Sequence, residues 1–243
     1  MNEIALVLHG CIGFAEHSSG SAGADGKGKP ANVADCANSH KYSFSNYNYD
    51  TFFHIWNPEH EKELNDLYNP ISSLSEPIIY DGKEWEKYLD SRFLSLNKAM
   101  NLKREHEIKN NFRYDWVIIS RFDNVILTKL NLDDCDNDLL WGCGIMSGVP
   151  YQSDFIWICN SEKADKIGNM INERNEGQYQ LNDCHAVINA KIKDVFGENI
   201  NNFVFKQFED LDLYRFVINP SASRKPNEFA TTMKDRLEEI LKK

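Results

Sequence analysis

The sequence predicts an α/β fold in which a mostly parallel central sheet is flanked by helices. Short apolar runs rich in β-branched and aromatic residues, such as residues 4–8 and 116–119, are typical of strands buried on both faces of a sheet. Segments with helical spacing of apolar residues separate these runs, and this alternation favours parallel strands. The 243 residues, 42% of them hydrophobic, can build one large core, so we expect a single domain over residues 1–243.

The first strand, at residues 4–8, ends abruptly in His9, Gly10 and Cys11. A strand followed by glycine is how nucleotide-binding α/β folds bring backbone amides close to a ligand. The chain has neither GxGxxG nor GxxxxGK[ST], so dinucleotide and P-loop sites are not predicted. We take the three residues as candidate ligand-binding positions, although His9 is more often a polar residue that ends a strand.

Residues 15–48 are rich in Gly, Ser and Asn and show no apolar periodicity. Such a segment buries too little surface to offset the entropy of ordering it. We therefore expect a long mobile loop over the ligand edge of the sheet, where it could act as a lid. An insertion that never contacts ligand is the alternative.

The next elements follow from strand, helix and turn signals. Residues 49–56 form an apolar strand closed by Asn-Pro, residues 59–68 a short charged helix, and residues 76–80 a third strand. Apolar residues then recur at three- and four-residue steps over residues 85–109. This spacing predicts a long amphipathic helix, with a possible break near Ser91.

The stretch from residue 114 to residue 126 organises the chain. Its buried run at residues 116–119 is followed by Arg121, Phe122 and Asp123, where a buried strand must reach the surface. In open α/β sheets ligands bind at the carboxyl ends of the strands, so Asp123 is well placed to hold a divalent cation through oxygen. The simpler interpretation is that Arg121 and Asp123 pair with each other.

The second half continues the alternation of strands and helices. Residues 133–138 form an acidic turn that lacks the EF-hand glycine and glutamate, so we expect a solvated loop there. Asp154 opens a strand at residues 153–159, and Ser161 is a candidate N-cap for the following helix. Residues 139–144 are expected to return to the core. The last predicted elements are a helix at 180–190, strands at 203–205 and 214–218, and a helix at 227–241.

Composition excludes several classes of function. The net charge is −10 with no dense Lys/Arg cluster, which argues against a nucleic-acid partner. The longest apolar runs fall far below the roughly 20 residues of a membrane span, and the N-terminus lacks the features of a signal peptide. Six scattered cysteines without a CxxC pair are typical of reduced thiols, so we expect a cytoplasmic protein (host cytoplasm for a viral chain) without zinc.

Five segments occur in an order that resembles the small GT-A type glycosyltransferases of bacterial polysaccharide clusters and large DNA viruses. They are IALVLHG, YDTFFHIWNP, FLSLNKAMNLKREHE, NNFRYDWVIISRFD and YQSDFIWICNSEKADKI. The resemblance covers most of the chain between residues 4 and 218. It implies a nucleotide-sugar donor, with a UDP-sugar favoured, and a glycan or other hydroxyl acceptor. It also implies that Asp123 binds Mn²⁺ or Mg²⁺, although Arg121 stands where the family usually has a first aspartate.

Glycosyl transfer breaks an anomeric C–O bond and releases a nucleoside diphosphate, so a cation or an arginine must stabilise the charge on the phosphates. His9, Gly10, Cys11, Arg121 and Asp123 are the candidate donor-binding residues, and Asp123 is the candidate metal ligand. An inverting reaction also needs a base near the acceptor. Asp154, Asp183 and His185 are the candidates, and Asp154 has the best position although it could equally cap a turn.

Two other classes remain to be weighed. A non-catalytic relative could keep the fold and bind a sugar or a partner protein, which the missing first aspartate and the long loop allow. A sulfotransferase is disfavoured because no phosphate-binding loop follows the first strand. A phosphohydrolase is disfavoured because His and Asp residues do not cluster at the spacing of a metal pair.

Overall fold

The structure is a computed structural model, and every structural statement below concerns the residues that it describes. These are residues 3–12, 31–77, 84–144, 152–181, 183–197, 202–206, 210–213, 217 and 227–242.

A seven-stranded sheet forms the centre, with the strand order β3-β2-β1-β4-β7-β6-β8. The pairs β1–β2, β1–β4, β2–β3 and β6–β8 are parallel, whereas β7 runs antiparallel to both of its neighbours. The expected mostly parallel sheet is therefore confirmed, with one reversed strand. The strands are β1 (Ile4–Gly10), β2 (Asp50–Ile55), β3 (Ser72–Ser75), β4 (Trp116–Arg121), β6 (Trp141–Gly144), β7 (Gln152–Cys159) and β8 (Asn202–Lys206).

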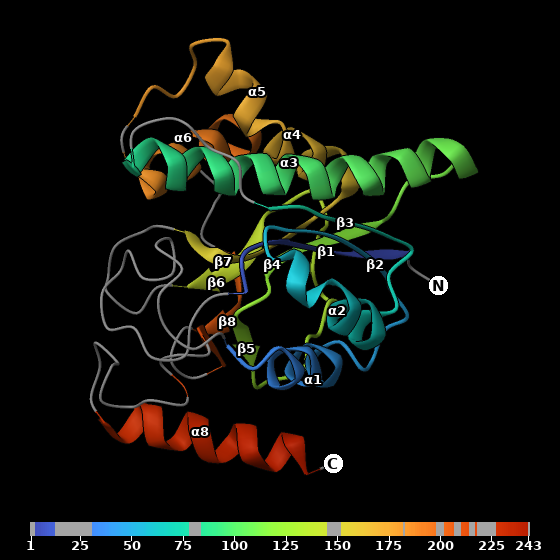
Figure 1. Cartoon of the computed structure of the whole chain (residues 1–243), viewed down its shortest axis with the longest axis vertical. Coiled ribbons are helices and arrows are strands. Elements are labelled where there is room, and N and C mark those ends of the chain that lie inside the picture. Colours follow the sequence, from blue (N-terminus) through green and yellow to red (C-terminus); the bar gives the residue numbers. More distant parts are fainter. Residues whose placement is uncertain are drawn as a thin grey trace.

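Helices cover both faces of this sheet (Figure 1). One layer contains α3 (Glu84–Asn110), α4 (Ser161–Gly168), α5 (Met170–Asn175) and α6 (Cys184–Phe196). The opposite layer contains α1 (Val33–Ser43), α2 (Glu61–Tyr68), α8 (Asn227–Leu241), the short helix η1 (Pro58–His60) and a two-stranded sheet of β5 (Asn124–Ile126) and β9 (Leu211–Leu213). None of the helices in the described part of the chain is long and apolar enough to cross a bilayer.

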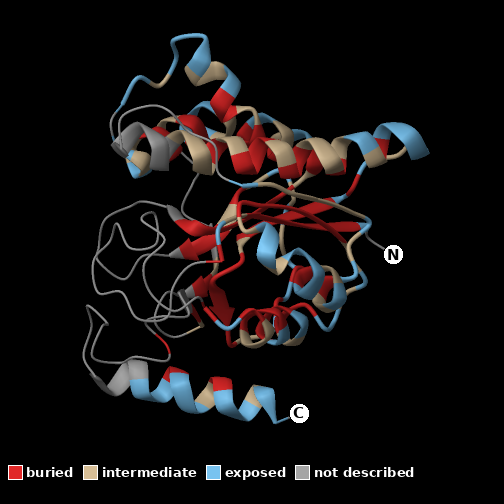
Figure 2. Ribbon diagram, in the orientation of Figure 1, coloured by how far each residue is buried: buried red, intermediate tan, exposed pale blue. Residues whose placement is uncertain are grey.

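Alternate residues of the central strands feed two separate cores. On β4, Val117 and Ile119 pack with α3 and α4, whereas Trp116 and Ile118 pack in the cluster that includes α1 and α8. Successive side chains of a strand point to opposite faces, so a continuous apolar run is what a sheet covered on both sides requires. Figure 2 shows the result, with buried strands between helices whose buried residues face inward.

The expected loop at residues 15–48 is wrong in its second half, where α1 forms. Asn32 caps this helix, because its side chain accepts hydrogen bonds from the amides of Ala34 and Asp35. The helix was hidden in the sequence because its buried face is mostly small or polar: Val33, Cys36, Ala37, Ser39, His40 and Ser43. Residues 15–30 of the expected loop lie outside the described residues.

Other boundaries differ in smaller ways. The third strand is β3 and precedes the expected residues 76–80, of which 78–80 are outside the described part of the chain. Helix α3 continues through Ser91 without the expected break. Asn160, and not Ser161, caps α4 by accepting a hydrogen bond from the amide of Lys163. The late strand is β9, while residues 214–216 and 218 of the expected strand are not described.

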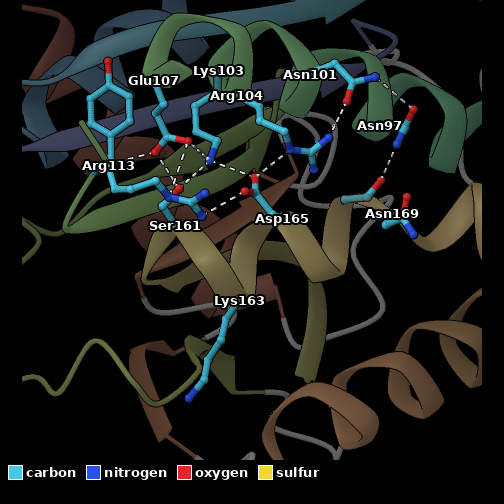
Figure 3. A network of polar contacts seen from close by, with 12 residues as sticks. Asn97, Asn101, Lys103, Arg104, Glu107, Arg113, Ser161, Lys163, Asp165 and Asn169 are labelled. Atoms are coloured by element: carbon cyan, nitrogen blue, oxygen red, sulfur yellow. Dashed lines mark hydrogen bonds and ion pairs between the residues drawn. The ribbon is translucent and has the colours of Figure 1, made fainter. Parts of the chain in front are cut away.

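A buried network of charges joins α3 to α4 (Figure 3). The Lys103 ammonium is 0% exposed and lies 2.9 Å from Glu107 Oε2 and 2.8 Å from Asp165 Oδ1. It also donates to Ser161 Oγ, which in turn donates to Glu107 Oε1 at 2.6 Å. Arg113 closes the group with a 2.9 Å contact to Asp165. These contacts fix α4 on α3, and α4 directly follows β7.

Candidate active site

Three strands bring predicted site residues to one edge of the sheet. His9 on β1 lies opposite Arg121 on β4, both at the carboxyl ends of their strands. Asp154 lies near the beginning of β7, two residues before Ile156, which pairs with Ser120. Because β7 is antiparallel, its beginning meets the edge at which β1 and β4 end. This is the edge where open α/β sheets bind their ligands.

Arg121 and Asp123 form a two-pronged ion pair across a tight turn. Arg121 Nε donates to Asp123 Oδ1 and Nη2 donates to Oδ2, both at 2.7 Å. Phe122, between them, is buried and packs edge to face on Phe53 with ring centroids 5.6 Å apart. Asn124 fastens the turn to β7 by donating to the carbonyl of Phe155 at 2.5 Å. The simpler interpretation of the RFD stretch is therefore correct: its two charged residues pair.

Arg92, on α3, is a site residue that the sequence analysis missed. Its Nη2 forms an ion pair with Asp154 Oδ2 and donates to the Asp154 carbonyl at 3.0 Å, while Nη1 donates to Cys184 Sγ at 3.5 Å. Arg121 Nη1 lies 3.7 Å from the same Asp154 oxygen. The four charged groups therefore alternate in sign in the order Asp123, Arg121, Asp154, Arg92.

This alternation keeps Asp154 and the two arginines ionised. Burial alone would raise the pKa of Asp154, but Arg92 and Arg121 hold this pKa well below its ordinary value. Burial alone would lower the pKa of Arg121, yet Asp123 and Asp154 raise it above its ordinary value. A carboxylate held this firmly in its charged form accepts a proton poorly, so Asp154 is unsuited to act as a base.

His9 adds a buried neutral group to the same edge. Its pKa lies well below the ordinary value, first because of burial and then because of the positive charges of Arg92 and Arg121. His9 Nδ1 is buried, and no hydrogen-bond partner for it is found among the residues that the structure describes. A buried polar atom without a partner is uncommon in a folded protein, and at a ligand edge it is available to a ligand.

Gly10 and Cys11 follow directly. Gly10 has φ +104°, a backbone conformation that residues other than glycine adopt only with strain, and Cys11 is exposed. The Gly10 amide donates to Ser95 Oγ at 2.7 Å, so α3 fixes the end of β1. Gly10 therefore lies at this edge with a backbone conformation that needs glycine and an amide held by α3.

Ser95 continues into a buried relay that the sequence analysis also missed. Ser95 Oγ lies 2.7 Å from His54 Nδ1, and His54 Nε2 lies 3.2 Å from Glu76 Oε1. Burial, and then Lys98, lowers the pKa of His54 to about 3, so its ring is neutral. The tautomer that suits both contacts donates from Nε2 to Glu76 and accepts at Nδ1 from the Ser95 hydroxyl. Ser95 is 0% exposed, which suits a positioning role and not that of a nucleophile.

Replacing Ser95 with Ala is expected to lower the free energy of unfolding by about 1–3 kcal/mol, because the Gly10 amide and His54 Nδ1 both lose a buried partner. Urea unfolding followed by circular dichroism measures this change. Ser73→Ala is the matched control, since Ser73 donates one half-exposed hydrogen bond to Asn65. Equal effects of the two substitutions would contradict the positioning role of Ser95.

The two remaining predicted residues lie at the start of α6. Asp183 is exposed and is the N-cap of the helix, where its Oδ1 accepts from the Ala186 amide at 2.8 Å. His185 is exposed in the first turn, close enough to Asp154 to help lower the pKa of that carboxyl. The neighbouring Cys184 already contacts Arg92. The structure therefore brings His185, rather than Asp183, to the charged cluster.

The donors at this edge do not fit the divalent cation expected at Asp123. Both Asp123 oxygens accept from Arg121, and Asp154 Oδ2 is in contact with Arg92. A cation at either carboxylate would lie beside a guanidinium of like charge. Over the described ranges, no group of three or more His, Cys, Asp or Glu side chains is arranged to hold a metal ion. A divalent cation could therefore bind Asp123 only if the Arg121 guanidinium moved away from the carboxylate.

Comparison of the chain with models of known protein families and with curated protein sequences gives no match.

Proposed function

We propose that the protein is a glycosyltransferase of the GT-A type, which transfers a sugar from a nucleoside diphosphate sugar to a hydroxyl acceptor. The observation that carries this proposal is the meeting of Arg92, Arg121 and neutral His9 where β1 and β4 end and β7 begins. An α/β sheet binds its ligand at this edge, and guanidinium groups are well suited to diphosphates. The order of the segments that resemble such enzymes supports the same conclusion.

Arg121 would contact the diphosphate of the donor. Of the five N–H groups of a guanidinium, Arg121 uses Nε–H and one Nη2–H for Asp123. The other N–H groups, including both on Nη1, which lies 3.7 Å from Asp154 Oδ2, would donate to phosphate oxygens. As the anomeric C–O bond breaks, these groups would stabilise the charge that develops on the leaving nucleoside diphosphate. Asp123 would hold the guanidinium in position.

His185 is the best candidate for the base that an inverting reaction requires. Asp154 is held ionised by two arginines, and Asp183 caps α6, whereas His185 is exposed next to the cluster. An exposed imidazole beside the cluster can accept the proton of the acceptor hydroxyl. Asp154 would then balance the positive charge of the two arginines and hold Arg92 in position.

Isothermal titration against UDP- and GDP-sugars tests the function, with CMP-sugars, which carry a single phosphate, as the comparison. One nucleotide is expected to bind, with the UDP-sugars favoured, and that donor is then assayed for sugar transfer and hydrolysis. Failure of every member of the panel to bind, with manganese present as well as without it, would remove the proposal.

The substitution His185→Asn is expected to leave donor affinity unchanged and to lower the rate of sugar transfer. The asparagine keeps a polar side chain but cannot accept the proton of the acceptor hydroxyl. The measurements are the transfer rate and the donor affinity of both proteins under the same conditions. A parallel loss of donor affinity would instead make His185 a donor-binding residue.

A second candidate function is a sugar-binding protein without catalysis. The observation that favours it is the internal pairing of all four charged groups, which leaves the cluster with no net charge. One measurement, the rate of sugar transfer or hydrolysis of a bound donor, distinguishes the two functions. A binding protein would bind the donor and neither transfer nor hydrolyse its sugar.

A further inference from the structure

We infer that Arg121 is a built-in cation, which occupies the position between Asp123 and Asp154 that a divalent ion would take in a metal-dependent site. The Nε and Nη2 edge of its guanidinium holds both oxygens of Asp123 at 2.7 Å. Its other terminal nitrogen, Nη1, faces Asp154 Oδ2 at 3.7 Å. One planar cation thus joins a carboxylate from the turn after β4 to a carboxylate from β7.

The surroundings of the pair show that this arrangement is built into the fold. Asp123 is 3% exposed, and the turn that carries it is anchored on both sides, by buried Phe122 and by the Asn124 contact to β7. Asp154 has a second guanidinium, that of Arg92, which is itself fixed by the Asp154 carbonyl and Cys184. Two positive and two negative groups balance, so the cluster requires no additional cation.

The consequence for ligand binding follows from the donors that are left. A divalent cation usually contacts a diphosphate and a carboxylate at the same time. Arg121 can do the same, because it binds Asp123 with one edge. Its Nη1 lies 3.7 Å from Asp154 Oδ2, too far for a hydrogen bond, and so keeps its N–H groups for phosphate oxygens. The chain therefore binds a nucleoside diphosphate without a divalent cation. This last statement rests on the proposed function.

The first experiment measures the affinity of the unmodified protein for UDP and GDP by calorimetry, once with EDTA and once with Mn²⁺. Equal affinity under both conditions is the expected result. A loss of more than about tenfold in EDTA would overturn the inference while leaving the proposed function intact. If neither nucleotide binds under either condition, the proposed function fails, and the second experiment decides the role of Arg121.

The second experiment uses manganese alone, with bound and free Mn²⁺ distinguished by electron paramagnetic resonance. The unmodified protein is expected not to bind Mn²⁺ at this edge, whereas Arg121→Ala, which exposes two carboxylates to each other, should gain one site. The double variant Arg121→Ala with Asp123→Asn should lose that site again. Binding of Mn²⁺ by the unmodified protein that disappears in Asp123→Asn would overturn the inference, as would an Arg121→Ala variant that folds by circular dichroism and gains no site.

Discussion

Asp123→Asn is expected to lower the rate of sugar transfer, or of donor hydrolysis, by about 10²- to 10³-fold, the usual effect of losing one preorganised electrostatic contact. The asparagine keeps the size of the side chain but loses its charge. It can accept from only one of the two Arg121 donors, and its own NH₂ would face the other. Arg121 would then no longer be held where the leaving phosphate requires it.

The control for this change is Asp133→Asn, in the exposed acidic turn, which should leave the rate unchanged. Because breaking a buried ion pair also destabilises the fold, both variants must be shown to be folded at the assay temperature. If Asp123→Asn kept a normal rate and Asp133→Asn abolished it, the active site would lie at the acidic turn and our assignment of Asp123 would be wrong.

The second large effect concerns stability. Lys103→Met should lower the free energy of unfolding by about 3–5 kcal/mol, because it leaves Glu107 and Asp165 without their buried cation. At roughly 2–4 °C per kcal/mol for a chain of this size, the melting temperature should fall by about 6–20 °C. Urea unfolding and a thermal scan measure the two quantities.

Lys62→Met is the matched control. Lys62 and Asp66 also lie four residues apart on a helix and are 2.7 Å from each other, but Lys62 is 90% exposed. Solvent screens such a pair, so its loss should change stability very little. The double variant Lys103→Met with Glu107→Leu should recover part of the lost free energy of unfolding, because it removes one of the two carboxylates that have lost Lys103. Similar effects of Lys62→Met and Lys103→Met would show that the network adds nothing beyond a surface pair.

The parts of this fold that could be predicted from sequence are those with a local signal. The run at residues 116–119 is apolar at every position, which is typical of a strand covered on both faces, and the structure places it in the middle of the sheet. Helix α1 lacked such a signal because its buried side includes Ser39, His40 and Ser43. The direction of β7 had no signal either, since an apolar run is the same in both directions.

The contacts within the site were predicted only where the two residues are close in the sequence. Arg121 and Asp123 are two positions apart, and their pairing was one of two interpretations of the sequence. Arg92 meets Asp154 across 62 residues, and Ser95 meets His54 across 41, so neither contact has a local pattern. Lys103 and Glu107 have the spacing of an ordinary surface pair. Their burial depends on α4, which supplies Asp165 and Ser161 to the network.

The positions of His9, Arg92, Arg121 and Asp154 have a consequence for cooperativity. Each belongs to a regular strand or helix, β1, α3, β4 or β7, and none to a connecting loop. Central strands and the helices packed on them open only in the rarest, most global fluctuations of a domain. These four residues therefore loosen only together with the sheet. Loss of ligand binding in rising denaturant should coincide with loss of the fold itself, so that the site and the domain behave as one thermodynamic unit.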